Sequence, residues 1–216
     1  MKKEDMNNTI HGEQLALLRE AIGKRLIDIE HEKPDGNEVL QRIRFNVEGK
    51  WYTLDNKVDW FENYFAQPDS IPHMVFLRRE EESEWNMEPE RYPIGETITN
   101  VLLVNDHVDV LDGGEHYQNR DSTEAVVIET NNRQYGFFKG NTCLDETVLL
   151  GKGHDVLSKL EPLKAHWDIF GKPFDAKVTR RLIPLKDGAE TEMDRVSIEG
   201  DPSTIDGVDL NREFGS

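Results

Sequence analysis

The chain has 216 residues and a formal net charge of −17, because 43 Asp and Glu outnumber 26 Lys and Arg. Its length allows one large or two small domains, and its nine Phe, five Tyr and four Trp exceed what disordered chains carry. So acidic a chain excludes free nucleic acid as a direct ligand, since phosphates must meet a cationic surface.

The start of the chain is charged and is not followed by the apolar segment of a secretory signal. No stretch of sequence approaches the roughly 18 apolar residues that span a membrane. A single cysteine, Cys143, excludes an internal disulfide and a thiolate-rich metal site. We therefore expect a cytoplasmic protein that has no membrane contact.

A helix and a hairpin are the first predicted elements. In residues 13–22 the apolar side chains recur three and four apart, and Gly23 suits a left-handed helix stop. Residues 43–47 alternate apolar and polar, and the turn Glu48-Gly49 leads into residues 51–54. We expect a half-buried hairpin there.

A second amphipathic helix is predicted over residues 58–65, and its aromatic side chains suit a core. The alternative is an outward-facing patch, in which Trp60 and Tyr64 are bordered by Asp59 and Glu62. From the sequence, we expect this patch to be the surface that binds a protein partner.

An acidic run with few apolar residues follows at 78–91 and marks a boundary. Its partner-binding candidates are Glu80, Glu81, Glu82, Glu84 and Trp85. A solvated helix face or linker is one interpretation of such a run. The other is an acidic strip that binds a partner, with Trp85 as its anchor.

Imidazoles and carboxylates crowd residues 107–121, and these are groups that divalent metals bind. If a strand begins at His107, then His107 and Asp109 share one face, and His116 folds back from a loop expected at 111–121. The spacing matches neither the helical zinc motif nor the calcium loop. A solvated acidic loop is therefore the simpler interpretation, and no cofactor is expected.

Further elements are predicted in the second half of the chain. Residues 125–130 and 134–138 suit a second hairpin, and residues 176–183 return through 193–198 as a third. Residues 156–160 suit a third short helix ahead of a proline.

Residues 152–186 are locally basic, with eight Lys and Arg against four Asp and Glu. The dominant cations are Lys172, Lys177, Arg180 and Arg181. A solvated strand face explains them, and so does a cationic ridge that meets an acidic surface. Cys143, with His154 and Asp155 further on, has the residue types of a thiol nucleophile but no indicated geometry, so a buried small side chain is favoured.

A faint internal duplication relates the two halves. The apolar pattern of residues 22–29 returns at 94–101, and that of 43–54 returns at 126–137. The second copy is longer between its two segments, which places extra residues in the expected loop.

The predicted fold class is therefore α+β, with mostly antiparallel sheet in two related tandem modules and a few short covering helices. The first module, residues 1–91, begins with the N-terminal helix. The second, residues 92–199, is a diverged repeat of the first. Residues 200–216 form an acidic tail that we expect to be loosely ordered.

These features favour an acidic, non-enzymatic binding or inhibitor protein that acts stoichiometrically on a basic protein partner, such as a nucleic-acid-binding enzyme. Immunity proteins and phage anti-defence proteins have this profile, which is an analogy of class. One alternative is a metal-dependent hydrolase that uses the His107–Asp121 cluster. Another is a structural or assembly protein whose acidic and basic regions pair between copies, which leaves a homo-oligomer open.

Overall fold

The computed structural model describes residues 5–31, 42–62, 68–80, 89–139, 148–168, 170–171, 173–201, 204–205 and 208–209. Side chains are described in these ranges except at residues 42, 55–62, 68–80, 148–149, 204–205 and 208–209.

Antiparallel strands make up most of the described chain, together with two short α-helices and one 3-10 turn. The helical elements are α1 (Gly12–Ala21), η1 (Leu157–Lys159) and α2 (Leu163–His166). The strands are β1 (Met6–Asn8), β2 (Arg25–His31), β3 (Arg42–Val47), β4 (Lys50–Glu62), β5 (Pro68–Glu80), β6 (Glu90–Asp112), β7 (Glu115–Thr130), β8 (Gln134–Lys139), β9 (Val148–Gly153), β10 (Phe174–Pro184), β11 (Thr191–Ile198), β12 (Thr204–Ile205) and β13 (Val208–Asp209).

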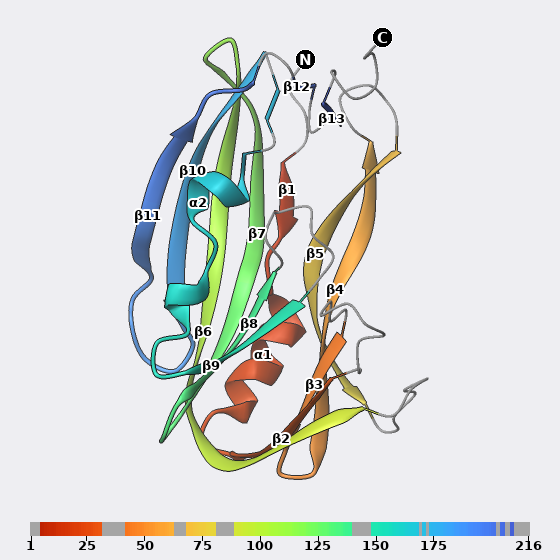
Figure 1. Cartoon of the computed structure of the whole chain (residues 1–216), viewed down its shortest axis with the longest axis vertical. Coiled ribbons are helices and arrows are strands. Elements are labelled where there is room, and N and C mark those ends of the chain that lie inside the picture. The colour runs from red at the N-terminus through yellow and green to blue at the C-terminus, as the bar shows by residue number, and fades with distance from the viewer. Residues whose placement is uncertain are drawn as a thin grey trace.

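The 23-residue strand β6 organises the sheet. Its first part pairs with β2 and its second part with β10, while β7 runs along the opposite edge. The sheet therefore forks at β6: β3, β4 and β5 follow β2 on one branch, and β11 follows β10 on the other (Figure 1). β8 and β9 continue the sheet beyond β7.

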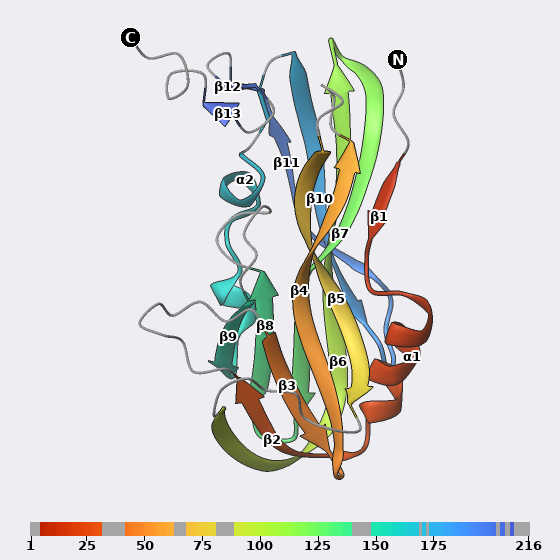
Figure 2. The same cartoon turned by 90° about the vertical axis from the view of Figure 1, so that its right-hand side faces the viewer.

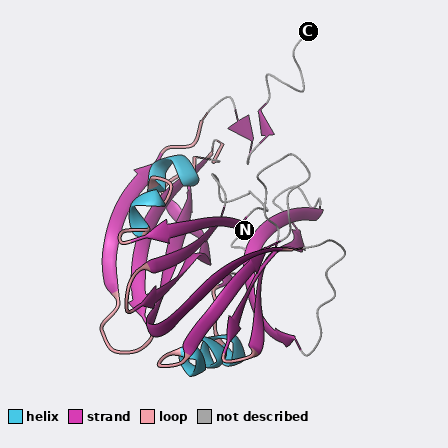
Figure 3. Ribbon diagram, turned by 60° about the horizontal axis from the view of Figure 1, so that its bottom comes forward, coloured by secondary structure: helices cyan, strands magenta, loops and turns pink. Residues whose placement is uncertain are grey.

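The sheet is curled rather than flat, as a view from near one end shows (Figure 3). The helices α1 and α2 lie on opposite sides of the long strands (Figure 2). α1 packs Leu18 and Ala21 into the main core, which also takes residues from β2, β3, β4, β6, β7 and β8. On the α2 side, Leu163 and Trp167 pack into a second core with β6 and β10.

The first helix and all three hairpins are confirmed. α1 covers nearly the expected residues, and Gly23 beyond it has a φ of 85°, which suits a residue without Cβ. The pairs β3–β4, β7–β8 and β10–β11 are antiparallel, as the alternating patterns predicted.

The helix expected over residues 58–65 is wrong for residues 58–62, and residues 63–65 lie outside the described residues. β4 continues to Glu62 and pairs with β5 throughout, with Val58 opposite Pro72 and Trp60 opposite Ser70. Aromatic and β-branched residues suit an extended strand as well as a helix face, and a long partner strand decides between them.

The loop expected at residues 111–121 is also wrong. β6 and β7 run to a two-residue turn, Gly113 and Gly114, whose φ values are 58° and 87°. Two positive φ values match the twist of a two-residue hairpin turn. The two glycines therefore connect β6 to β7 directly, and the residues around them remain in the strands. The helix expected at 156–160 is only the 3-10 turn η1, and the one-turn α2 follows Pro162.

The two tandem modules are not confirmed and stay a prediction. β2 of the expected first module pairs directly with β6 of the second, so one sheet runs through both. At the start of the expected tail, Asp201 donates its backbone N–H to Phe170 O at 2.9 Å, and Gly200 donates to Asp175 Oδ1 at 2.9 Å. Those two residues are therefore anchored on the folded part of the chain.

Candidate functional site

The two faces of the β6–β7 pair carry different chemistry at the level of residues 105–109. Asp106 points to the α2 side and is 1% exposed. His107, its neighbour, points to the other side, and its side chain is 35% exposed. Strand geometry alone separates them, because successive side chains alternate between faces.

Asp106 is at the centre of a buried ionic network on the α2 side. Arg180 of β10 lies opposite it and donates from Nε to Oδ1 and from Nη2 to Oδ2, both at 2.8 Å. Trp167 Nε1 donates to the same Oδ2 at 2.7 Å. Arg180 Nη1 also donates to Glu161 O at 2.8 Å, so the network fastens the α2 segment to the sheet.

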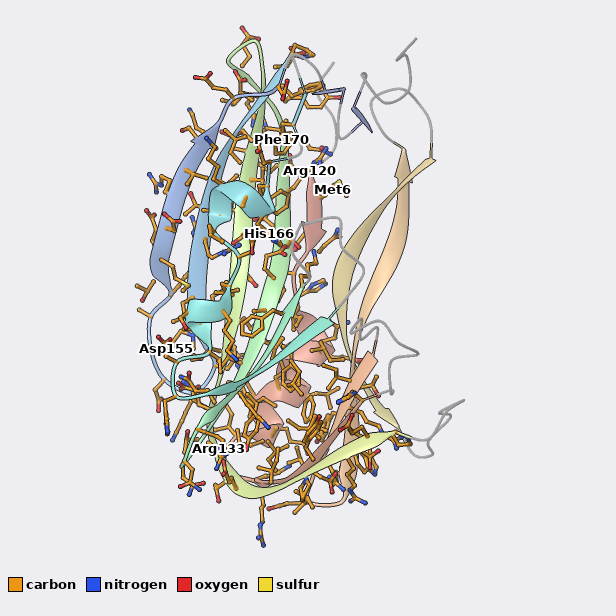
Figure 4. The ribbon with its side chains drawn as sticks, viewed as in Figure 1. Met6, Arg120, Arg133, Asp155, His166 and Phe170 are labelled. Carbon is orange, nitrogen blue, oxygen red and sulfur yellow. The ribbon has the colours of Figure 1, made fainter. Side chains whose placement is uncertain are left out.

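Glu124 extends the network and reaches it through a β-bulge. Val104 pairs with Ala125 and Asn105 with Thr123, which leaves Glu124 as the extra residue of β7. A bulge breaks the alternation of faces and can re-aim a side chain. Glu124 Oε1 accepts from Lys139 Nζ at 3.3 Å, and Oε2 lies 2.8 Å from Nε2 of His166, which Figure 4 labels beside α2.

The electrostatics of the network follow from its burial and its fixed partners. Burial alone would raise the pKa of Glu124, but the charges of Lys139 and His166 outweigh it and hold that pKa far below the ordinary value. Burial raises the pKa of Asp106, and the Arg180 fork opposes that rise. Although burial by itself lowers it, the pKa of Arg180 is raised by the hydrogen bonds and charge of Asp106, so the guanidinium stays charged.

Asp106, Glu124 and His166 have the residue types of a metal site, with one ligand atom from each lying within 4.8 Å of the others. Both oxygens of Asp106 are already engaged, and Arg180 and Lys139 already neutralise the two carboxylates. A divalent ion would add two uncompensated positive charges to a buried site, which is strongly unfavourable. These residues therefore do not fit a metal ion in this arrangement, and they form a closed structural network.

The opposite face carries the histidines that the sequence suggested as weak metal ligands. His107 Nδ1 lies 2.8 Å from Asp121 Oδ1, and His116 Nδ1 lies 2.7 Å from Asp109 Oδ1. The prediction that His107 and Asp109 share a strand face agrees with this arrangement. Each histidine pairs with a different carboxylate, so the structure gathers the four residues as two separate pairs.

A second ionic cluster lies on β2, β3 and the start of β6. Its members are Asp28, Glu30, Arg44 and Arg91. Arg44 Nε donates to Glu30 Oε2 at 2.8 Å, and Arg91 Nε donates to Asp28 Oδ2 at 3.1 Å. Arg44 also lies over the ring of Trp51, with its Cζ 4.5 Å from the ring centroid.

The partner-binding residues expected from the sequence stay a prediction, because their side chains lie outside the described part of the chain. The structure places Asp59, Trp60 and Glu62 on β4 and Glu80 on β5, and their side chains lie outside the described set. The remaining candidates, Tyr64, Glu81, Glu82, Glu84 and Trp85, lie outside the described residues, as do Cys143 and Lys172.

Arg180, which was expected in a cationic surface ridge, is buried and is not part of the surface. Arg180 is 4% exposed and paired with Asp106, because it lies on the strand face that α2 covers. Arg181, on the other face of β10, pairs with Glu190 at 2.9 Å.

The buried network itself was missed from the sequence. One signal was present, since Asp106 falls in phase with Val104 and Val108, which are buried on one strand face. A carboxylate in an apolar phase predicts a buried partner. The bulge at Glu124 and the docking of His166 leave no comparable trace in the sequence.

Neither described helix has the length and apolar character needed to cross a membrane. No family model matches the chain, and no curated protein or solved structure is significantly similar to it.

Proposed function

We propose that the chain is an acidic, non-enzymatic protein that binds a basic protein partner stoichiometrically, in the manner of immunity or phage anti-defence inhibitors. The observation that carries this proposal is where the charge lies. Among the residues whose burial is described, only two units of net negative charge are buried, since five carboxylates oppose three cations: Asp28, Glu30, Glu96, Asp106 and Glu124 against Arg44, Lys139 and Arg180. The rest of the negative surplus of these described residues is on exposed or half-buried side chains, where it attracts cationic macromolecules.

The β10–β11 hairpin and the segment after it illustrate this surface charge. Their exposed acidic residues are Asp187, Glu190, Glu192, Asp194, Glu199 and Asp201. The guanidinium of Arg195, the one cation within residues 187–201, is paired with Glu192 at 2.7 Å. The hairpin also exposes Lys177, Arg181 and Lys186, so its acidic excess begins after residue 186. An excess of one sign steers a partner of opposite sign and raises its association rate.

A binding role is also favoured over assembly through the β11 edge. Met193 is the extra residue of a β-bulge, since Arg180 pairs with Asp194 and Arg181 with Glu192. The backbone N–H of Arg195 is taken by Asp194 Oδ1 at 2.7 Å. A bulge and an occupied backbone N–H oppose the pairing of a further strand with β11. A partner would therefore contact this edge through side chains.

The test is capture of a partner from extracts of the native or a competing organism on the immobilised full chain at low salt. A captured basic protein is then purified and titrated against the chain by calorimetry. We expect saturation at a fixed ratio and an affinity that falls as ionic strength rises. Recovery of no basic protein, or binding that is indifferent to salt, contradicts the proposal.

A further inference from the structure

β2 presents two carboxylates on one face of the sheet. Asp28 and Glu30 lie two residues apart, and their side chains are 3% and 6% exposed. Cross-strand pairing sets Glu30 between Arg44 of β3 and Arg91 of β6. Two carboxylates held this close need cations, because an unpaired buried charge is strongly unfavourable.

The two arginines occupy different environments. Arg44 is buried like its carboxylate partner, with its side chain 6% exposed, so it is a fixed part of the sheet face. The side chain of Arg91 is 56% exposed, and it meets Asp28 and Glu30 from the solvent side. Arg44 is held against Glu30, and Arg91 is the cation that contacts Asp28.

Arg91 satisfies the Asp28 carboxylate incompletely. Its Nε and Nη2 both donate to the same oxygen, Asp28 Oδ2. Asp28 Oδ1 is buried and has no hydrogen-bond partner within the described chain. Arg91 Nε is also 3.5 Å from Glu30 Oε1, which is a loose contact. A guanidinium that approaches a carboxylate in the two-pronged geometry engages both oxygens, which is the stronger arrangement.

We propose that Asp28 and Glu30 form a guanidinium-binding site, and that Arg91 is an internal stand-in that an arginine of the basic partner displaces. The inference rests on the proposed function and names the contact chemistry of that partner. An arginine supplied by the partner pairs with both oxygens of Asp28, and Arg91 swings into solvent, where its side chain already largely lies. Trp51, on which Arg44 stacks, adds an aromatic ring of the kind that favours guanidinium groups nearby.

The test is chemical rescue in the full chain carrying Arg91→Ala, with N-methylguanidinium chloride as the probe. The thermal midpoint is measured against sodium chloride of equal ionic strength. At tenfold over its dissociation constant the probe should raise the midpoint of Arg91→Ala by about 3 to 6 °C, in a saturable way. Arg91→Met, which keeps an apolar stem, should show the same rescue.

Three controls make the result specific. Arg195→Ala, which removes another exposed arginine from an acidic partner, should show no saturable shift. Asp28→Asn added to Arg91→Ala should abolish the rescue. Methylammonium, a point charge without the planar fork, should give a smaller shift than methylguanidinium.

The inference is overturned if methylguanidinium shifts Arg91→Ala no more than Arg195→Ala, or if rescue survives Asp28→Asn. This experiment needs no partner, so it separates the two proposals. Rescue without any basic partner in the capture experiment leaves the site and removes the proposed function. Capture of a basic partner without rescue supports the proposed function and removes the guanidinium-binding site.

Discussion

The two faces of the β6–β7 pair use the same kinds of side chain for different purposes. On the α2 side, Asp106 and Glu124 are both 1% exposed and are neutralised by buried cations. On the other side, His107 and Asp121 form a pair whose side chains are 35% and 38% exposed. Breaking a buried ion pair costs about 3–5 kcal/mol, whereas an exposed pair contributes about 0–1 kcal/mol. Burial therefore decides which charges hold this fold together.

Asp106→Ala should give the largest effect, because it leaves Arg180 buried without its carboxylate. We expect the free energy of unfolding in urea to fall by about 3–5 kcal/mol. The double variant Asp106→Leu with Arg180→Met should recover most of that loss, since apolar replacement of a whole buried pair is often neutral. A loss below 1 kcal/mol for the single variant would mean that the network is open to water.

Glu124→Gln tests the bulge and its charge through pH. The pKa of Glu124 lies below its ordinary value of 4.5, so the folded state keeps the carboxylate ionised where the unfolded chain takes up a proton. Its stabilisation is complete above about pH 4.5 and is lost as pH falls below that value. Asp106, whose pKa is raised, acts in the opposite sense and is present in both proteins.

The measurement is therefore the difference in unfolding free energy between wild type and Glu124→Gln from pH 6 to pH 3. We expect a difference of about 2–3 kcal/mol at pH 6, since a charged hydrogen-bonding partner of Lys139 and His166 is lost. This difference should shrink toward acid pH. A difference that is constant with pH would show that the charge of Glu124 contributes nothing.

Trp167→Phe keeps a smaller aromatic ring in the second core and removes the Nε1–H whose hydrogen bond Asp106 accepts. Loss of one hydrogen bond to a charged group should lower the unfolding free energy by about 1.5–3 kcal/mol. Native-state hydrogen exchange should show the extra opening in the segment around α2. Uniform loss of protection across the sheet would contradict the view that Trp167 fastens this segment.

Asp121→Ala should give the smallest effect, although it deletes an aspartate of the same sheet. Its pair with His107 is partly in water, so the expected loss is about 0–1 kcal/mol in the same urea assay. A loss as large as that of Asp106→Ala would mean that this face is covered as completely as the other.

Local patterns predicted the local elements. The spacing of apolar residues around Leu18, and Gly23 after them, was enough for α1, and alternation with a short turn was enough for each hairpin. Elements decided by distant partners were not predictable. Val58 and Trp60 suit either a helix or a strand until β5 lies beside them.

The buried network depends on contacts far apart in sequence. Arg180 meets Asp106 across 74 residues and His166 meets Glu124 across 42. Glu124 also needs a bulge to face the network, and no turn residue marks that bulge. The net charge, by contrast, is a sum over residues and depends on no contact between them, so the sequence alone predicted an acidic protein.

If the surface charge of this chain serves to bind a basic protein, the binding must weaken as salt screens that charge. Calorimetric titration of the captured protein at low and at high salt tests it most directly. We expect saturable binding at a fixed ratio, with an affinity that falls as salt is added. Absence of saturable binding at low salt would contradict it.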